Sequence, residues 1–242
     1  MADIRIAGSG KVAASGNVYD HVSISGSGRI EGTLHCKSVS TAGSGHLEGD
    51  VFCDGKISTA GSCRFDGDVE CDVMSTAGSA SVDKNIRCNV FKTAGSTRVG
   101  GNVEGKEIRI AGVLDAKGDV SGEEVAIAGS ATIGGLLNAE NIEIKLNGTN
   151  RIGEIGCTRL DVHPEHVSQF SLFGMRLGGN SRYGKLICKV IEGDDISLVL
   201  TEAAVVRGKT VKIGAGCEID RVEYSESIDI DDKAKVKEQI KI

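Results

Sequence analysis

Aromatic residues are scarce in this chain of 242 residues: they make up 3% of it, and tryptophan is absent. Proline occurs once, at Pro164. A globular domain of this size normally fills a wide core with aromatic side chains, yet 40% of the residues here are hydrophobic. The composition therefore predicts a narrow core of aliphatic and small side chains. The 34 glycines indicate repeated turns rather than disorder.

Other common features are missing too. No apolar run is long enough to span a bilayer, and residues 1–6 lack the charged and apolar regions of a signal peptide. The 28 basic and 34 acidic residues are interspersed and give a net charge of −6, so no nucleic acid partner is expected. Eight cysteines without an export signal predict reduced thiols and a cytoplasmic protein.

One short tag, most often Ala-Gly-Ser, recurs through the first half of the chain. Successive tag glycines are 17 or 18 residues apart: Gly8, Gly26, Gly43, Gly61, Gly78, Gly95, Gly112 and Gly129. An alternating pair precedes each tag, as in Ile57/Thr59 and Ile108/Ile110. Apolar, polar, apolar is the period of a strand with one buried face.

Each repeat holds about three short strands separated by glycine turns, for example residues 57–60, 64–66 and 68–72. A unit of this length cannot bury its apolar face alone, whereas stacked units close a continuous core. One repeat per coil places equivalent residues about 4.8 Å apart, the spacing of paired strands. The predicted fold is all-β: a parallel β-helix (β-solenoid) with 17–18-residue coils, roughly 13 of them, on the order of 60 Å long.

The pattern divides the chain into three parts. Residues 1–146 carry the regular repeats, and residues 191–242 contain further coils and a charged tail. We interpret residues 147–190 as irregular or extended coils with a strand-rich excursion, because the alternating pair at Leu160 next recurs at Ile196. This stretch contains His163-Pro164-Glu165-His166 followed by Phe170, Leu172, Phe173 and Tyr183. The conformation of residues 163–186 is left open by the pattern.

Four cysteines, Cys36, Cys53, Cys71 and Cys88, recur at one position on consecutive coils. A line of thiols about 4.8 Å apart cannot surround a tetrahedral metal ion, and parallel Cβ vectors suit disulfides poorly. We interpret the cysteines as an inward column of small core residues. The same coils carry Thr41, Thr59, Thr76 and Thr93, in phase with buried residues, which argues against an exposed ice-binding face.

The histidines form no recognisable catalytic pattern: His21, His35, His46, His163 and His166. The last two could be metal ligands, but a solvated loop is the favoured interpretation. No catalytic, cofactor-binding or metal-binding residue is therefore predicted. Two outward columns of opposite charge are expected to form ion pairs and to keep the sheet from sticking laterally: Arg29, His46, Arg64 and Arg98 beside Glu31, Glu48, Asp66 and Asp83.

The repeated tag, its spacing and the Gly-Asp/Asn-Val sequences that follow it (as at Gly49-Asp50-Val51) resemble the bactofilins, the polymer-forming cytoskeletal proteins of bacteria. The stretch from Val206 to Ile219 resembles the longer Gram-positive members. The resemblance implies a right-handed β-helix whose ends stack on other copies to give nucleotide-independent, non-polar filaments. Many bactofilins begin with a disordered tail that carries a membrane-targeting segment. This chain instead enters its first strand by Ile4, which argues against direct membrane binding.

A solenoid has two open ends, each a row of unpaired strand groups above an apolar cross-section. The residues predicted to form polymerisation interfaces are Ile4, Ile6 and Val12 at the N-terminal end and Val222, Tyr224, Ile228, Ile230 and Val236 at the C-terminal end. The predicted function is a structural scaffold and not an enzyme. Its expected partner is another copy, with a paralogous bactofilin or a membrane-anchored protein as further candidates; the latter would place it at the membrane.

The alternative is a trimeric left-handed β-helix acyltransferase, because Ile127 to Ile133 and Ile213 to Ile219 are each a step of six positions, like a hexapeptide repeat. The 17-residue steps, the missing sub-period in residues 36–110 and the lack of a catalytic histidine argue against it. A carbohydrate-active β-helix ranks third, because such enzymes usually have longer coils, an acidic cluster and an export signal.

Overall fold

The computed structural model describes residues 2–14, 16–164, 171–172, 175–176 and 184–242, and the regular elements of these residues are all β-strands. The first sixteen are β1 (Ala2–Ile6), β2 (Ser9–Ala13), β3 (Val18–Ile24), β4 (Ser27–Glu31), β5 (Leu34–Thr41), β6 (Ser44–Leu47), β7 (Val51–Thr59), β8 (Ser62–Phe65), β9 (Val69–Thr76), β10 (Ser79–Val82), β11 (Ile86–Thr93), β12 (Ser96–Val99), β13 (Val103–Ile110), β14 (Val113–Ala116), β15 (Val120–Ser121) and β16 (Glu124–Ile127).

Longer strands follow, with a short antiparallel pair between them. They are β17 (Ser130–Lys145), β18 (Asn150–His163), β19 (Ser171–Leu172), β20 (Met175–Arg176), β21 (Leu186–Leu198), β22 (Thr201–Ile213), β23 (Glu218–Ile230) and β24 (Lys235–Lys241). Within the described part of the chain, no helix is long and apolar enough to cross a membrane.

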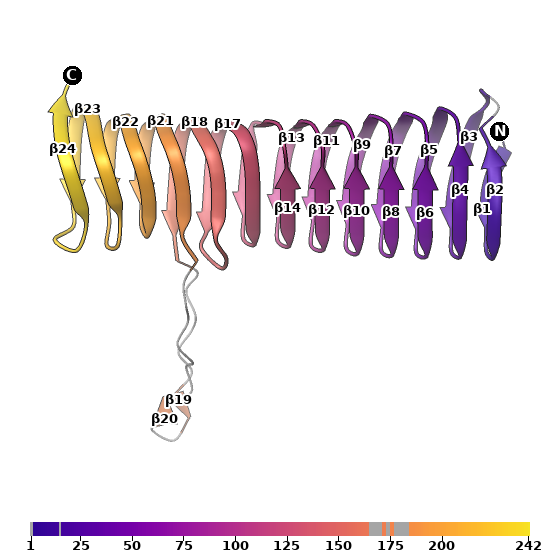
Figure 1. Ribbon diagram of the computed structural model, residues 1–242, viewed down its shortest axis with the longest axis horizontal. Helices are drawn as coiled ribbons and strands as arrows, with labels where there is room; N and C mark the ends of the chain where they lie inside the picture. Colours follow the sequence, from indigo (N-terminus) through magenta and orange to yellow (C-terminus); the bar gives the residue numbers. More distant parts are fainter. Residues whose placement is uncertain (1, 15, 165–170, 173–174, 177–183) are drawn as a thin grey trace.

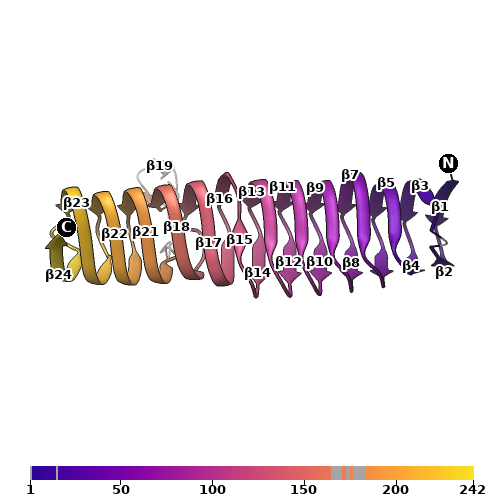
Figure 2. The same ribbon diagram turned by 90° about the horizontal axis from the view of Figure 1, so that it is seen from above.

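The chain winds as a parallel β-solenoid of about 13 turns, which confirms the predicted all-β fold. Each strand pairs with its equivalent one turn later. In β9 and β11, for example, Cys71 lies opposite Cys88 and Thr76 opposite Thr93. The turns stack along one axis, and the two termini lie at opposite ends of the rod (Figures 1 and 2).

Each turn has three short faces. In β5 the buried residues are Leu34 and Cys36, then Val39 and Thr41. Buried residues are two positions apart on either side, but three positions separate Cys36 from Val39. This wider spacing marks a corner, because the side chains on both sides of it still point inward. We name the three faces by their position in the N-terminal turn: face 1 contains Ile4 and Ile6, face 2 contains Val12, and face 3 contains Tyr19.

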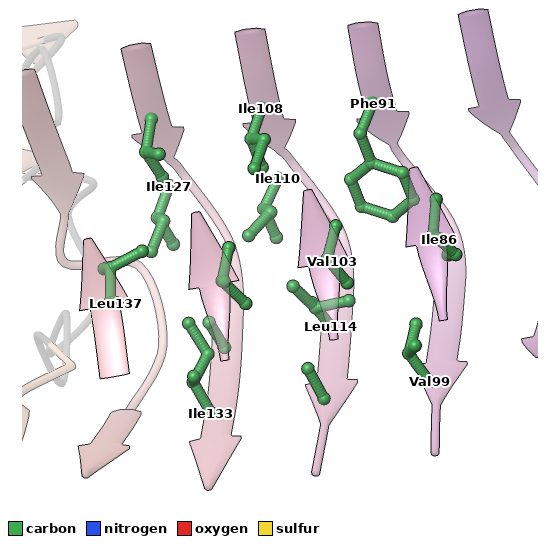
Figure 3. Close-up of a cluster of buried hydrophobic side chains, with 14 of the residues drawn as sticks. Ile86, Phe91, Val99, Val103, Ile108, Ile110, Leu114, Ile127, Ile133 and Leu137 are labelled. Carbon is green, nitrogen blue, oxygen red and sulfur yellow. The ribbon is translucent and has the colours of Figure 1, made fainter. Parts of the chain in front are cut away.

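The core is a stack of inward side chains that equivalent positions supply turn after turn. Phe91 pairs with Met74 on one side and Ile108 on the other, and all three are fully buried. Figure 3 shows Phe91, Ile108, Ile110 and Leu114 projecting from the strands into the same interior. The narrow, mostly aliphatic core predicted from the composition is therefore observed.

The solenoid is continuous across its irregular segment. Leu160 of β18 pairs directly with Ile196 of β21, and Asn150 pairs with Leu186. The 36-residue step from Leu160 to Ile196 is therefore a single turn from which the chain departs and returns. The predicted residues His166, Phe170, Phe173 and Tyr183 lie outside the described residues. The division of the chain at residues 146 and 190 stays a prediction.

The tag glycines occupy the corner between faces 1 and 2, where successive turns come closest. A Cβ added to Gly78 would lie 2.0 Å from the carbonyl oxygen of Gly61 in the preceding turn. The backbone amides of Ala77 and Gly78 both donate to the carbonyl oxygen of Thr59, at 2.8 and 3.2 Å. Any side chain here would have to push two hydrogen-bonded turns apart, so this corner requires glycine.

Replacing Gly78 with alanine should lower the free energy of unfolding by about 1–3 kcal/mol, because backbone atoms rather than a flexible side chain oppose the new methyl group. The matched control is Gly8→Ala in the first turn, where an added Cβ meets nothing within 4 Å. Thermal unfolding followed by circular dichroism compares the two. Equal melting temperatures for both variants would contradict this account of the corner.

Candidate assembly surfaces at the two ends of the solenoid

The N-terminal end of the solenoid is formed by β1 and β2. These strands pair with β3 and β4 on their inner edges, and no described strand pairs with their outer edges. The side chains of Ile4 and Ile6 point inward and are 5% and 7% exposed, while Val12 is half-buried. Tyr19 closes the same end on face 3 and is also buried. Ile4, Ile6 and Val12 lie beside backbone edges with which no described strand pairs, whereas Tyr19 pairs with Ala2 on its outer side.

The C-terminal end is formed by β23 and β24. Ile228 and Ile230 lie on face 1, on the part of β23 with which β24 does not pair, and both are half-buried. Val236 of β24 lies on face 2 above Ile219 and is also half-buried. These three predicted interface residues therefore lie on the last turn and keep some exposed surface.

The other two predicted residues of this end lie one turn deeper. Val222 is fully buried, and Tyr224 is half-buried, because β24 pairs with this part of β23. Gln239 lies opposite Val222 and Lys241 opposite Tyr224. The structure thus places all five predicted residues at the C-terminal end, but β24 stands between Val222 and the outside.

Two ion pairs connect β24 with β23. Lys235 Nζ lies 2.7 Å from Glu218 Oε1, and Lys237 Nζ lies 2.6 Å from Asp220 Oδ1. The hydrogen bond from Lys235 lowers the pKa of Glu218, and the hydrogen bond to Asp220 raises the pKa of Lys237. Both pairs lie on the solvated outer surface.

The cysteine column is confirmed as inward packing. Cys36, Cys53, Cys71 and Cys88 are paired in register on face 3 and are 2–8% exposed. A hydrogen bond between the thiols of Cys36 and Cys53 raises the pKa of Cys36 and lowers that of Cys53, and Cys71 and Cys88 are related in the same way. The eight cysteines of the chain are free thiols.

The threonine column is also buried, so its hydroxyls cannot face solvent. Thr41, Thr59, Thr76 and Thr93 are each 1% exposed. Two of the hydroxyls have partners: Thr41 donates to Cys63 Sγ at 3.7 Å, and Thr97 donates to Thr93 at 3.0 Å. The Thr59 and Thr76 hydroxyl oxygens have no hydrogen-bond partner among the described residues.

The outward charges form the predicted ion pairs. Arg64 contacts Asp66 at 2.7 Å and Asp83 at 2.6 Å, and Arg29 contacts Glu48. His46 lies 2.8 Å from Asp66 beside Glu48, a grouping that resembles a cation site. Both carboxylates of this group already form ion pairs, Glu48 with Arg29 and Asp66 with Arg64.

His163 is half-buried at the base of the excursion. Its Nε2 lies 3.2 Å from Glu143 Oε1, and its Nδ1 lies 3.2 Å from the carbonyl oxygen of Pro164. Its suggested companion, His166, lies outside the described residues. His163 thus has a structural partner in Glu143.

The sequence analysis did not predict a set of side-chain hydrogen bonds at the corners, although the Gly-Asp/Asn-Val motif that supplies the acceptors was visible. The Asp or Asn of each Gly-Asp/Asn-Val sequence accepts a backbone N–H from the next turn: Asp68 N donates to Asp50 Oδ1 at 2.9 Å, and Asn85 N donates to Asp68 Oδ1 at 3.1 Å. The series continues through Asp119 N to Asn102 and Leu136 N to Asp119. A short acceptor side chain at each corner therefore ties the turns together.

Asn150 was also missed. It is fully buried at an inward position of face 2, and its Oδ1 accepts the backbone N–H of Ala131 at 2.8 Å. Its Nδ2 donates to the Gly148 carbonyl oxygen at 3.2 Å. The backbone N–H of Asn150 also donates to Lys185 at the point where the chain returns from the excursion. The same inward column also contains the buried residues Thr97 and Thr201, so a polar residue at this position did not stand out in the repeat pattern.

These features define a parallel β-solenoid with ordered inward columns and two open ends. Residues 1–87 match the sequence profile of the bactofilin family, described as polymer-forming cytoskeletal. The resemblance inferred from the repeats is thereby confirmed over residues 1–87.

Two curated relatives come from Bacillus subtilis (strain 168) and are themselves described as uncharacterized. YhbF is 42% identical over 103 residues, which cover 41% of this chain and 40% of the relative. YhbE is 37% identical over 105 residues, which cover 43% of this chain and 42% of the relative. The chain thus matches about two-fifths of the length of these relatives. No solved structure matches it.

Replacing Thr76 with valine should raise the free energy of unfolding by about 1 kcal/mol, because the variant removes a buried hydroxyl that makes no hydrogen bond while keeping the side-chain shape. Thr93→Val is the control: it removes the acceptor of the Thr97 hydroxyl and should lower the stability by about 1 kcal/mol. Chemical denaturation of both variants measures the difference. A Thr76→Val protein less stable than the parent would refute the interpretation.

Proposed function

We propose that this protein is a structural scaffold that assembles end to end into filaments without nucleotide. The observation that carries the proposal is the pair of solenoid ends: inward apolar side chains lie beside strand edges with which no described strand pairs. Free strand edges above an apolar surface are templates for another strand. The polymer-forming description of the matching family supports the same function.

The proposed contacts join like ends. A contact between two N-terminal ends is isologous, and a second contact between two C-terminal ends extends the assembly. A chain of alternating contacts of this kind has no polarity. The sides of the rod carry paired charges, such as Arg64 with Asp66 and Asp83, which oppose lateral association of rods. Association is therefore expected at the ends.

We infer that the protein acts through assembly and not through catalysis. Its proposed location is the cytoplasm, where eight free thiols stay reduced. The primary partner is another copy of the chain. A paralogous bactofilin could co-assemble through the same ends, and a membrane-anchored partner could bring the filament to a membrane.

Negative-stain electron microscopy of the purified protein, without nucleotide or metal, tests the proposal. Filaments or sheets are the expected result, and static light scattering should show a broad distribution of high masses. Discrete particles of one small size would contradict the proposed function. Stable trimers among them would favour the hexapeptide-type acyltransferase instead.

Replacing Ile230 with arginine tests how the ends pair. Burying the charged side chain in an end-to-end contact would be costly, so the C-terminal contact should be lost while the β-rich circular dichroism spectrum stays unchanged. If like ends pair, the variant should stop at dimers joined through their N-terminal ends; head-to-tail stacking would leave monomers. Asp229→Ala, on the outward face of the same strand, is the control and should still form filaments.

A further inference from the structure

The last strand of the solenoid differs chemically from the strand below it. In β23, the inward residues on face 3 are Val222, which is 0% exposed, and Tyr224, which is half-buried. In β24, the residues at the corresponding face 3 positions are polar, with Gln239 above Val222 and Lys241 above Tyr224. Polar residues at inward positions make a poor platform for a further apolar turn, so β24 acts as a closing strand.

Few buried contacts hold β24 in place. Along Lys235–Lys241 only Val236 and Ile240 are half-buried, and the other side chains are exposed. Its two ion pairs are also exposed: Lys235 and Glu218 by 79% and 57%, Lys237 and Asp220 by 78% and 59%. Exposed pairs contribute little individually and are screened by salt. The backbone ladder to β23 is therefore the main attachment of β24.

The segment that leads into β24 is short and polar. It runs from Asp231 to Ala234, and local hydrogen bonds from Lys233 and Ala234 to Asp231 shape it as a turn. Opening this turn would break the hydrogen bond from Gly216 N to the Lys233 carbonyl oxygen but would leave the strand pairs beneath intact, because β23 is the one described strand with which β24 pairs. The exposed edge of β23 would then offer Ile219, Val222 and Tyr224 to another strand.

We propose that two copies of this chain exchange β24 where their C-terminal ends meet, so that each β24 pairs with β23 of the other copy. The exchanged strand makes the same backbone ladder and the same lysine–carboxylate pairs as in a single chain. Exchange of identical elements is a low-cost route to an isologous dimer, and a short hinge favours it. The inference rests on the proposed end-to-end assembly and supplies the structure of its C-terminal contact.

A second copy is the occupant that fits this edge best. Along the edge of β23, acidic and apolar side chains alternate at Glu218, Ile219 and Asp220. The residues of β24 that face them are Lys235, Val236 and Lys237. The charges are thus complementary in the register that the chain itself uses. Because the closed and exchanged forms contain the same contacts, protein concentration decides between them.

Two charge-reversed variants separate exchange between copies from closure within one chain. The first, Lys235→Glu with Lys237→Glu, reverses β24. The second, Glu218→Lys with Asp220→Lys, reverses the edge of β23. Each variant alone has like charges facing each other, whether β24 folds back or is exchanged. In a mixture of the two, both exchanged pairings have opposite charges, whereas the folded-back pairings do not.

Each variant alone should lose the sedimenting polymer that the parent protein forms at low salt, and an equimolar mixture should recover it. Native mass spectrometry of the mixture should find pairs that contain one chain of each variant. A chain with all four substitutions is the control and should assemble like the parent. All four side chains are more than half exposed, so the variants should keep the β-rich circular dichroism spectrum.

Three outcomes would overturn the exchange. The single-type variants could polymerise as well as the parent, the mixture could stay as unassembled as its components, or mass spectrometry could find no mixed pairs. Any of these, with a parent protein that forms filaments, would leave the proposed scaffold function intact. A parent protein that forms no polymer would instead contradict the scaffold function itself.

Discussion

The close stacking of the glycine corner is the constraint on which the rest of the solenoid depends. At the Ala-Gly-Ser tag, the amides of one turn share the carbonyl oxygen of the turn before it, and the approach leaves no room for a Cβ. This contact repeats at every regular turn and fixes where the chain bends. Most later positions in the turn then fall into register with their equivalents, apart from local shifts such as that between Cys53 and Lys56, so inward and outward residues form columns.

Column formation explains the unusual composition. Once a position is inward in one turn, its neighbours above and below are inward too, and large side chains must be shared out among the columns. Phe91 occupies the same turn as Thr93, whereas the next turn has Ile108 and Ile110. Threonine and cysteine thus compensate for bulkier residues nearby. The consequence is that some hydroxyls, such as that of Thr76, are buried without a partner.

The sequence was sufficient to predict the strands, the coil length and the inward cysteine and threonine columns, because all of these follow directly from a 17–18-residue period. It also located both ends. The repeat period could not reveal that β24 covers Val222. Most residues of Lys235–Lys241 are polar, so the segment lacks the alternation of apolar and polar residues that marks the other strands. Nor could the period reveal the role of the buried Asn150, because polar residues recur in its column at Thr97 and Thr201 and the asparagine follows no period of its own.

The two ends of the solenoid differ in the polarity of the inward side chains on their outermost strands. The N-terminal turn presents Ile4, Ile6 and Tyr19 inward, while the C-terminal turn ends on Gln239 and Lys241 over most of face 3. An apolar end gains by burying itself against another surface, whereas a polar end gains little from direct contact. Association at the C-terminal end must therefore use either the uncovered Ile228 and Ile230 or a rearrangement of the strand that covers the rest.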